Sequence, residues 1–102
     1  MKRSVILGAL TIAGLSAGAS FAGTLDDVKA RGKLNCGVTE GTLGFSARDI
    51  QGEHQGFDVE FCRALAAAIF NDTDAVEYVE LSSQNRFTAL SSGQVDVLYR
   101  TT

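Results

Sequence analysis

The sequence predicts an α/β fold built on parallel strands. Helical and extended segments alternate along residues 24–99. Residues 59–70 place apolar side chains at helical spacing, and residues 76–81 alternate apolar and polar side chains as a half-exposed strand does. Alternation of helices and strands implies parallel strands joined by right-handed helical crossovers, which defines the α/β class.

The first expected helix covers Thr24–Arg31. Its threonine is a candidate N-cap, aspartates occupy its first turn and basic residues its last, where the helix dipole favours each charge. Gly32 can adopt the left-handed conformation that ends a helix. A short strand over Lys33–Val38 follows. Five glycines from residue 37 to residue 56 then predict a loop, with a turn near residues 50–53.

The strongest helix signal covers Val59–Phe70, which Asp58 opens and Asn71 can close in the left-handed conformation. Its broad apolar stripe contains Phe61, Cys62, Leu65, Ala66, Ala68 and Ile69. A strand is expected over Val76–Leu81, and the polar loop Ser82–Asn85 follows it.

The last expected helix is Arg86–Ser92, with Phe87 and Leu90 facing inward and Gly93 ending it. A third strand over Val95–Tyr99 completes the pattern. In open α/β sheets, ligands bind beyond the carboxyl ends of the strands, so the segments after the three strands form the candidate site.

Residues 1–22 have the plan of a secretory signal peptide. Lys2 and Arg3 precede an uncharged, mostly apolar run over Val5–Leu15, and small residues allow cleavage after Ala19 or Ala22. A membrane anchor and a buried helix are weaker alternatives, because glycines interrupt the run and it is shorter than the roughly 20 residues that span a bilayer. We expect export to the periplasm with cleavage near Ala22.

Charge and length restrict the class of protein. The formal charge is −3, and it becomes −5 without Lys2 and Arg3. This acidic balance argues against nucleic-acid binding, which needs a basic surface. Cleavage after Ala22 leaves 80 residues, enough for one domain at most. A core of that size is marginal without a covalent link or a partner.

The two cysteines, Cys36 and Cys62, lie on the first strand and on the inward face of the helix that follows it. An even number of cysteines in an exported protein favours a disulfide. The bridge would contribute roughly 3 to 3.5 kcal/mol in the chain-entropy model. Two buried thiols and a redox pair are the alternatives, although no C-x-x-C spacing is present.

Catalytic and metal-binding signals are weak. His54 is the sole histidine and lies in the glycine-rich loop, where we expect it to be solvated. A zinc site would need further ligands, and a Ser–His–Asp site would need a nucleophile elbow. Residues 37–44 match neither phosphate-binding glycine motif. We therefore expect no metal, no cofactor and no enzymatic activity.

The segments after the strands carry an acid, Glu40, an aromatic ring, Phe45, and the guanidinium groups of Arg86 and Arg100. They also carry the hydroxyl groups of Thr39, Thr42, Ser46, Ser82, Ser83, Thr101 and Thr102. Guanidinium and helix N-terminal N–H groups can bind a carboxylate, and an acid can bind an ammonium group, so this set suits a small zwitterion. Loops that are merely polar explain the same composition equally well.

Three stretches resemble the solute-binding proteins of polar-amino-acid ABC transporters, family 3, which have the type II periplasmic-binding-protein fold. They are Thr24–Leu34, Gly56–Ala68 and Arg86–Leu98. The second is the most specific, because it has the pattern G-[FY]-D-[VI]-[DE] followed by an alanine-rich helix. Residues 34–38, with Cys62, look most similar to the general L-amino-acid-binding branch of Gram-negative bacteria.

The resemblance implies a monomeric receptor with two lobes that closes on an L-amino acid and delivers it to an inner-membrane ABC permease. Residues 23–102 would form part of lobe 1, an open, mostly parallel sheet with helices on both faces. By position, the ligand-facing residues would be Glu40, Thr42, Phe45, Ser82, Ser83, Arg100 and Thr101.

Two departures from the family are expected to matter. Many relatives have proline followed by an aromatic residue where this chain has Gly44-Phe45, so the loop here is less rigid. The family's ligand-carboxylate arginine and its second lobe would follow residue 102. We therefore expect residues 23–102 alone to bind amino acids weakly or not at all.

Other functions are compatible with the same pattern. Some proteins of this fold are cyclohexadienyl dehydratases, and others serve as input domains of membrane-anchored signalling kinases. A small exported, disulfide-bonded interaction module is a further alternative, which would require cooperative folding of the 80 residues alone.

Overall fold

The computed structural model describes residues 23–100. The predicted signal segment, residues 1–22, and the candidate ligand residue Thr101 lie outside the described residues. No helix in the described part of the chain is both long and apolar enough to cross a membrane.

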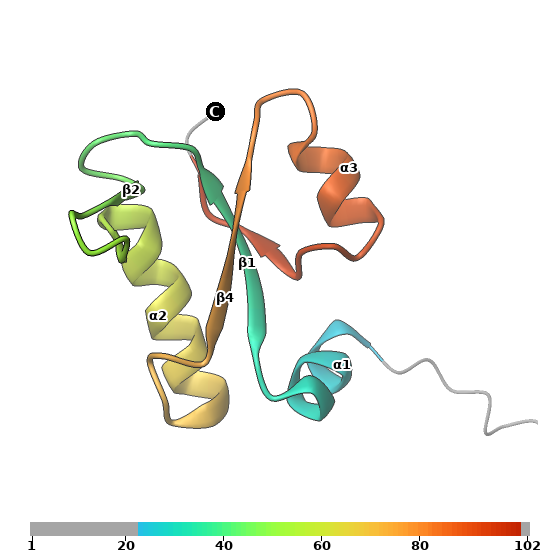
Figure 1. Ribbon diagram of the computed structural model, residues 1–102. Coiled ribbons are helices and arrows are strands. Elements are labelled where there is room, and N and C mark those ends of the chain that lie inside the picture. The colour runs from blue at the N-terminus through green and yellow to red at the C-terminus, as the bar shows by residue number, and fades with distance from the viewer. Residues whose placement is uncertain (1–22, 101–102) are drawn as a thin grey trace, which may run out of the picture.

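A parallel sheet of three strands forms the centre of the fold (Figure 1). The central strand β1 (Leu34–Thr39) pairs along its whole length with β4 (Val76–Leu81) and over two residues with β5 (Val97–Leu98). The strand order is therefore β4-β1-β5. The predicted α/β class and the parallel pairing are confirmed.

Helices cover both faces of this sheet, as expected. Helix α2 (Phe57–Phe70) packs on the face that presents Cys36, and a disulfide joins Cys36 to Cys62 of this helix. Helix α3 (Arg86–Ser91) lies on the opposite side of the sheet, next to β5 (Figure 1). Helix α1 (Thr24–Arg31) lies near the start of β1.

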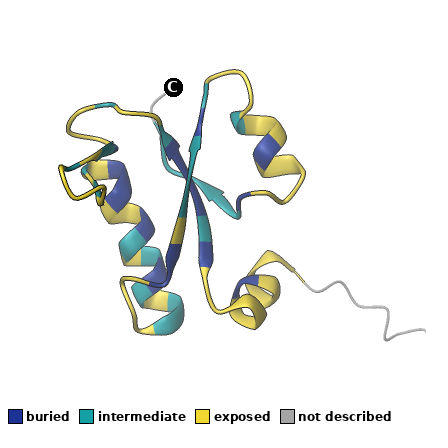
Figure 2. Ribbon diagram, viewed as in Figure 1, coloured by how far each residue is buried: buried dark blue, intermediate teal, exposed yellow. Residues whose placement is uncertain are grey.

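The two faces bury unequal cores, which Figure 2 shows as dark blue segments on the central strands and on the inner sides of the helices. The α2 face buries Val28, Leu34, Cys36, Val38, Cys62, Ala66, Ala75 and Val76. The α3 face buries Leu81, Ala89 and Val95. The larger core thus belongs to the face that also carries the disulfide.

The expected inward positions of Phe87 and Leu90 are wrong. Phe87 is 63% exposed and Leu90 is 41% exposed, whereas Ala89 between them is 3% exposed. The helix has only six residues and contacts the sheet through this small side chain, so its larger apolar groups stay outside. Phe87 packs instead under the guanidinium of Arg86, which lies 4.7 Å from the ring centroid.

The apolar stripe of α2 is narrower than expected. Cys62 and Ala66 are buried, and Leu65 and Ile69 pack against the same core. Ala68 is exposed, and Phe61 is 45% exposed. Helix α2 thus buries one side of the predicted stripe, and Phe61 stacks on Tyr99 with the ring centroids 5.3 Å apart.

The glycine-rich loop contains a small antiparallel hairpin that the sequence did not predict. Its strands are β2 (Ala47–Arg48) and β3 (His54–Gln55). The predicted turn near residues 50–53 does join them, and Asp49 fixes it by accepting the backbone N–H groups of Gln51 and Glu53. Strands of two residues are too short to produce a periodic pattern.

His54 is not solvated, contrary to expectation. Its side chain is 13% exposed, and its ring stacks on Tyr78 with centroids 4.6 Å apart. Its Nε2 atom lies 3.4 Å from Glu80, which also pairs with Arg48. The hairpin is therefore held against β4 by an aromatic contact and by ionic groups.

The helix ends follow the predicted chemistry in part. Gly32 and Asn71 have left-handed φ values of 82° and 57°, as expected for helix ends. The N-cap of α1 is Gly23, so Thr24 is the first helical residue and not the cap. Helix α2 starts at Phe57, two residues earlier than predicted.

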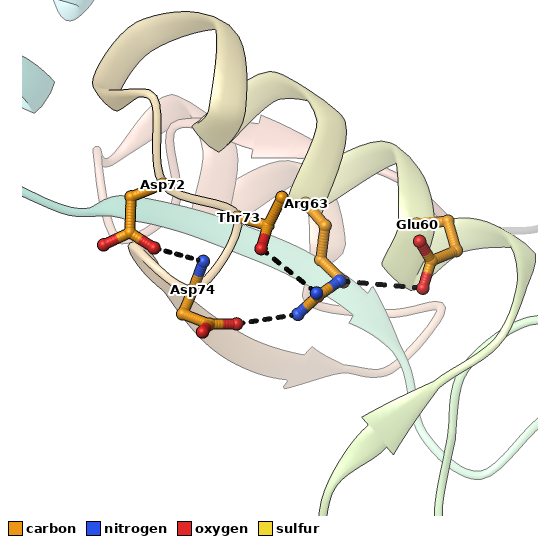
Figure 3. A network of polar contacts seen from close by, with 5 residues as sticks. All are labelled: Glu60, Arg63, Asp72, Thr73 and Asp74. Carbon is orange, nitrogen blue, oxygen red and sulfur yellow. Dashed lines mark hydrogen bonds and ion pairs between the residues drawn. The ribbon is translucent and has the colours of Figure 1, made fainter.

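A polar network joins α2 to the turn before β4 (Figure 3). Arg63 donates to Asp74 at 2.9 Å and to Thr73 at 3.1 Å, and it lies 3.7 Å from Glu60. The hydrogen bond to Asp74 raises the pKa of Arg63. Burial raises the pKa of the neighbouring Tyr78, and the charge of Arg63 partly opposes that rise. The network fixes the turn between the helix and the strand.

Candidate functional site

The candidate site is the carboxyl edge of the sheet, defined here as residues 39–46, 82–85 and 100, which follow or end the three parallel strands. The last pair in the β1–β4 register is Thr39 with Leu81. Glu40 and Ser82 follow directly, so the register brings the two loops to the same edge. Glu40 is exposed and Ser82 is half-buried.

The first loop folds back on itself. The N–H of Thr42 donates to the carbonyl of Ser46, and the N–H of Ser46 donates back to the carbonyl of Thr42. Leu43 at its tip is 85% exposed, and Phe45 is 40% exposed with its ring edge-on to Phe57 at 6.1 Å. The loop therefore presents apolar surface beside its polar groups.

The carbonyls of this loop cap helix α2. Gly44 accepts the N–H of Phe57 at 2.8 Å, and Phe45 accepts the N–H of Asp58 at 3.0 Å. Helix N-termini need such acceptors, and no side chain supplies one here. Gly56 allows the close approach, because a Cβ at its φ of 131° would lie 2.4 Å from the carbonyl of Phe45. The loop and the helix are thus joined by backbone contacts.

Asp58 is a buried acid next to the carboxyl edge, whereas the sequence pattern predicts only that it opens the helix. It is 8% exposed, and its backbone N–H is bonded to Phe45. Burial raises the pKa of its carboxyl, and the positive charge of Arg100 partly lowers it. The signal in the sequence that could have indicated this burial is the position of Asp58 between the apolar Phe57 and Val59, at the start of an amphipathic helix.

The second loop is held by two reciprocal hydrogen bonds. The N–H of Ser82 donates to Oδ1 of Asn85 at 2.9 Å, and the N–H of Asn85 donates to Oγ of Ser82 at 3.2 Å. Arg100 reaches this loop from the segment after β5, donating to the carbonyl of Leu81 at 2.5 Å and to Oγ of Ser83 at 3.4 Å. Ser83 is exposed.

The structure therefore brings some of the predicted residues into contact. Arg100 contacts Ser83, and Thr42 and Phe45 belong to one compact loop. Ser46 is 1% exposed and lies inside that loop. Within residues 23–100, no group of three or more potential metal ligands forms, and no pocket is enclosed.

A comparison with known protein families decides the class. Residues 34–102 match the family described as bacterial extracellular solute-binding proteins, family 3. The chain belongs to this family. The match covers all three strands of the parallel sheet and the whole carboxyl edge.

Relatives in this family that resemble the chain are named as binding proteins. The glutamate/glutamine/aspartate/asparagine-binding protein BztA of Rhodobacter capsulatus is 55% identical over 98% of this chain. The general L-amino acid-binding periplasmic protein AapJ of Rhizobium johnstonii is 48% identical over the full chain. In both cases the chain spans about 30% of the relative's length.

A solved structure supports the fold of this family 3 chain. An ABC transporter periplasmic binding protein from Brucella ovis, with glutathione bound, is 55% identical with a TM-score of 0.76. The similarity covers 78% of this chain and 25% of that protein. The described fold thus corresponds to a portion of a known periplasmic binding protein.

Proposed function

We propose that the chain is the N-terminal part of a periplasmic receptor that binds an L-amino acid and delivers it to an inner-membrane ABC permease. The observation that carries the proposal is the family 3 match, together with relatives at 55% and 48% identity whose names specify amino-acid binding. The α/β fold and its polar carboxyl edge suit this role, because ligands bind at such edges.

We assign residues 1–22 to a cleaved signal peptide and residues 23–102 to part of lobe 1. The receptor would act in the periplasm as a monomer, without a cofactor. The residues proposed to face the amino acid are Glu40, Thr42, Phe45, Ser82, Ser83, Arg100 and Thr101. Glu40 supplies an acceptor for an ammonium group, and Phe45 supplies apolar cover for an aliphatic stem.

The first test is the intact mass of the native exported product, measured with and without reductant. A product several times larger than residues 23–102 supports a receptor of which these residues form the front. A mass equal to residues 23–102, lower by two hydrogens without reductant, locates the cleavage at Ala22 and the disulfide in a short product. That short product would contradict the receptor function for this gene.

The second test is calorimetric titration of the native product with a panel of L-amino acids. Binding of at least one amino acid at micromolar concentration is expected. Glu40→Gln should weaken it, whereas Glu77→Gln, an exposed change on β4, should leave it unchanged. No binding by a product of receptor length would overturn the proposal. Residues 23–102 alone should bind weakly or not at all, and a millimolar or tighter affinity would contradict that expectation.

A further inference from the structure

Arg100 lies across the end of the central strand. It follows β5, whereas Leu81 ends β4, and β1 separates these two strands in the sheet. The guanidinium nevertheless donates to the carbonyl of Leu81 at 2.5 Å. To make this bond, its side chain must pass over the carboxyl end of β1.

The same guanidinium also contacts the loop after β4. Its second terminal nitrogen is 3.4 Å from Oγ of Ser83, so one planar group holds both the last residue of the strand and the loop that follows. A guanidinium can serve two acceptors in this way because its donors are fixed in a fork. The positive charge of Arg100 also acts on Asp58 at the start of α2, where it partly opposes the rise in the pKa of that carboxyl caused by burial.

We propose that Arg100 is a positioning residue that holds the Ser82–Asn85 loop against the ends of β1 and β5. Arg100 faces the proposed amino-acid site and fixes the placement of Ser82 and Ser83 there. Its guanidinium is bonded to Leu81 and Ser83, so it is not the group that receives the ligand's carboxylate. The ligand part of this inference rests on the proposed function. The restraint on the loop is a property of the unliganded chain and can be measured without any amino acid.

The test is amide hydrogen exchange of the purified chain without ligand. The reporters are the N–H groups of Ser82 and Asn85, whose hydrogen bonds depend on the loop being closed. Arg100→Met should speed their exchange by about tenfold or more, because charge-assisted hydrogen bonds are lost. Arg100→Lys should show a smaller increase, because an ammonium keeps the charge without the fork.

The matched control is Arg48→Met. It removes an arginine that pairs with Glu80 of β4, the strand whose last residue, Leu81, accepts the bond from Arg100. It should leave both reporters unchanged. The N–H of Leu34, which donates to the carbonyl of Ala75 at the far end of the sheet, reports global opening and should not change in any variant. Unchanged exchange at Ser82 and Asn85 in Arg100→Met would overturn the proposal, as would equal acceleration at Leu34.

If Arg100→Met does not fold, a second variant can test the same restraint on the loop. Ser83→Ala removes one acceptor on the surface and leaves the core intact. Nuclear magnetic resonance of the Arg100 guanidinium should show faster rotation in Ser83→Ala than in the wild type, and an identical rate would contradict the restraint. Failure of the calorimetric titration with normal loop exchange would remove the proposed function and leave the restraint standing.

Discussion

The two faces of the sheet are built differently. The α2 face buries eight residues in one cluster and is crossed by the Cys36–Cys62 disulfide. The α3 face buries three residues, and the helix above it contacts the sheet through Ala89, with Phe87 and Leu90 exposed. A covalent link thus lies where packing is already extensive, and the thin face depends on a few side chains and on hydrogen bonds at the carboxyl edge.

This difference suggests that the α2 face is the rigid part of the fold and that the α3 face is the part that can adjust. The α2 face fixes β1 and the start of the helix that the first loop caps. The α3 face carries the loop that Arg100 holds. Regions with few buried apolar contacts open locally at lower free energy, so we expect motion to concentrate in residues 82–95.

Matched leucine truncations give the largest expected effects. Leu34 is 1% exposed on the α2 face, and Leu81 is 2% exposed on the α3 face. Leucine-to-alanine changes in cores cost about 2–5 kcal/mol, and the cost rises when the cavity cannot collapse. In denaturant unfolding, Leu34→Ala should lower the free energy of unfolding by an amount near the upper end of this range. The loss for Leu81→Ala should lie near its lower end. Equal or reversed losses would contradict the inference that the α2 face is packed more extensively than the α3 face.

Removal of the disulfide is the next effect in size. The bridge closes a sequence separation of 26 residues. Its loss in Cys36→Ala/Cys62→Ala should lower the free energy of unfolding by about 3 to 3.5 kcal/mol in the chain-entropy model. Reduction of the wild type should reproduce this loss in the same denaturant titration. A change below about 1 kcal/mol would show that the α2 face does not depend on the covalent link.

Overpacking of the thin face should cost less. A Cβ at Gly37 would lie 2.7 Å from Leu98 and 2.8 Å from Leu81, in both cases against the end of a side chain. Extra methyl groups in cores cost about 1–3 kcal/mol, and we expect Gly37→Ala near the lower value because these leucine ends can rotate away. Combining it with Leu81→Ala should cost less than the sum of the two changes, and strict additivity would contradict the contact.

The smallest expected effect is the pH dependence that Asp58 contributes. Burial raises the pKa of this carboxyl in the folded state above its ordinary value of 3.8, so the folded state binds the proton more tightly than the unfolded state. Its contribution to stability is fully present below pH 3.8 and is lost as the pH rises through the folded-state pKa. The wild type should therefore lose stability relative to Asp58→Asn over that rise, measured by denaturant unfolding at several pH values. A difference in stability between the two proteins that stays constant with pH would contradict the raised pKa of Asp58.

The regular elements were largely predictable from the sequence because their patterns are local. The α1 and β4 bounds agree with the expectation, and the parallel sheet follows from the alternation of elements. The last strand is shorter than expected, since the N–H of Val95 bonds to the carbonyl of Ala89 in α3 and not to β1.

The candidate site was predictable in place but not in its contacts. The carboxyl edge follows from the α/β class, and the register confirms that the two loops meet there. The burial of Asp58 and the stacking of His54 on Tyr78 depend on residues distant in the sequence. No periodic pattern reports such contacts, and the two-residue hairpin strands leave no signal of their own.

The disulfide also joins two elements that are neighbours in the sequence. Cys36 is bonded to Cys62, at a sequence separation of 26, whereas the same strand residue pairs with Val97, much farther along the chain. Short loops close with a smaller entropic cost than long ones. The sequence contains two cysteines, so one copy of the chain can form a single intramolecular bridge. In an oxidising compartment, the covalent link between β1 and α2 can therefore form before β5 pairs with β1.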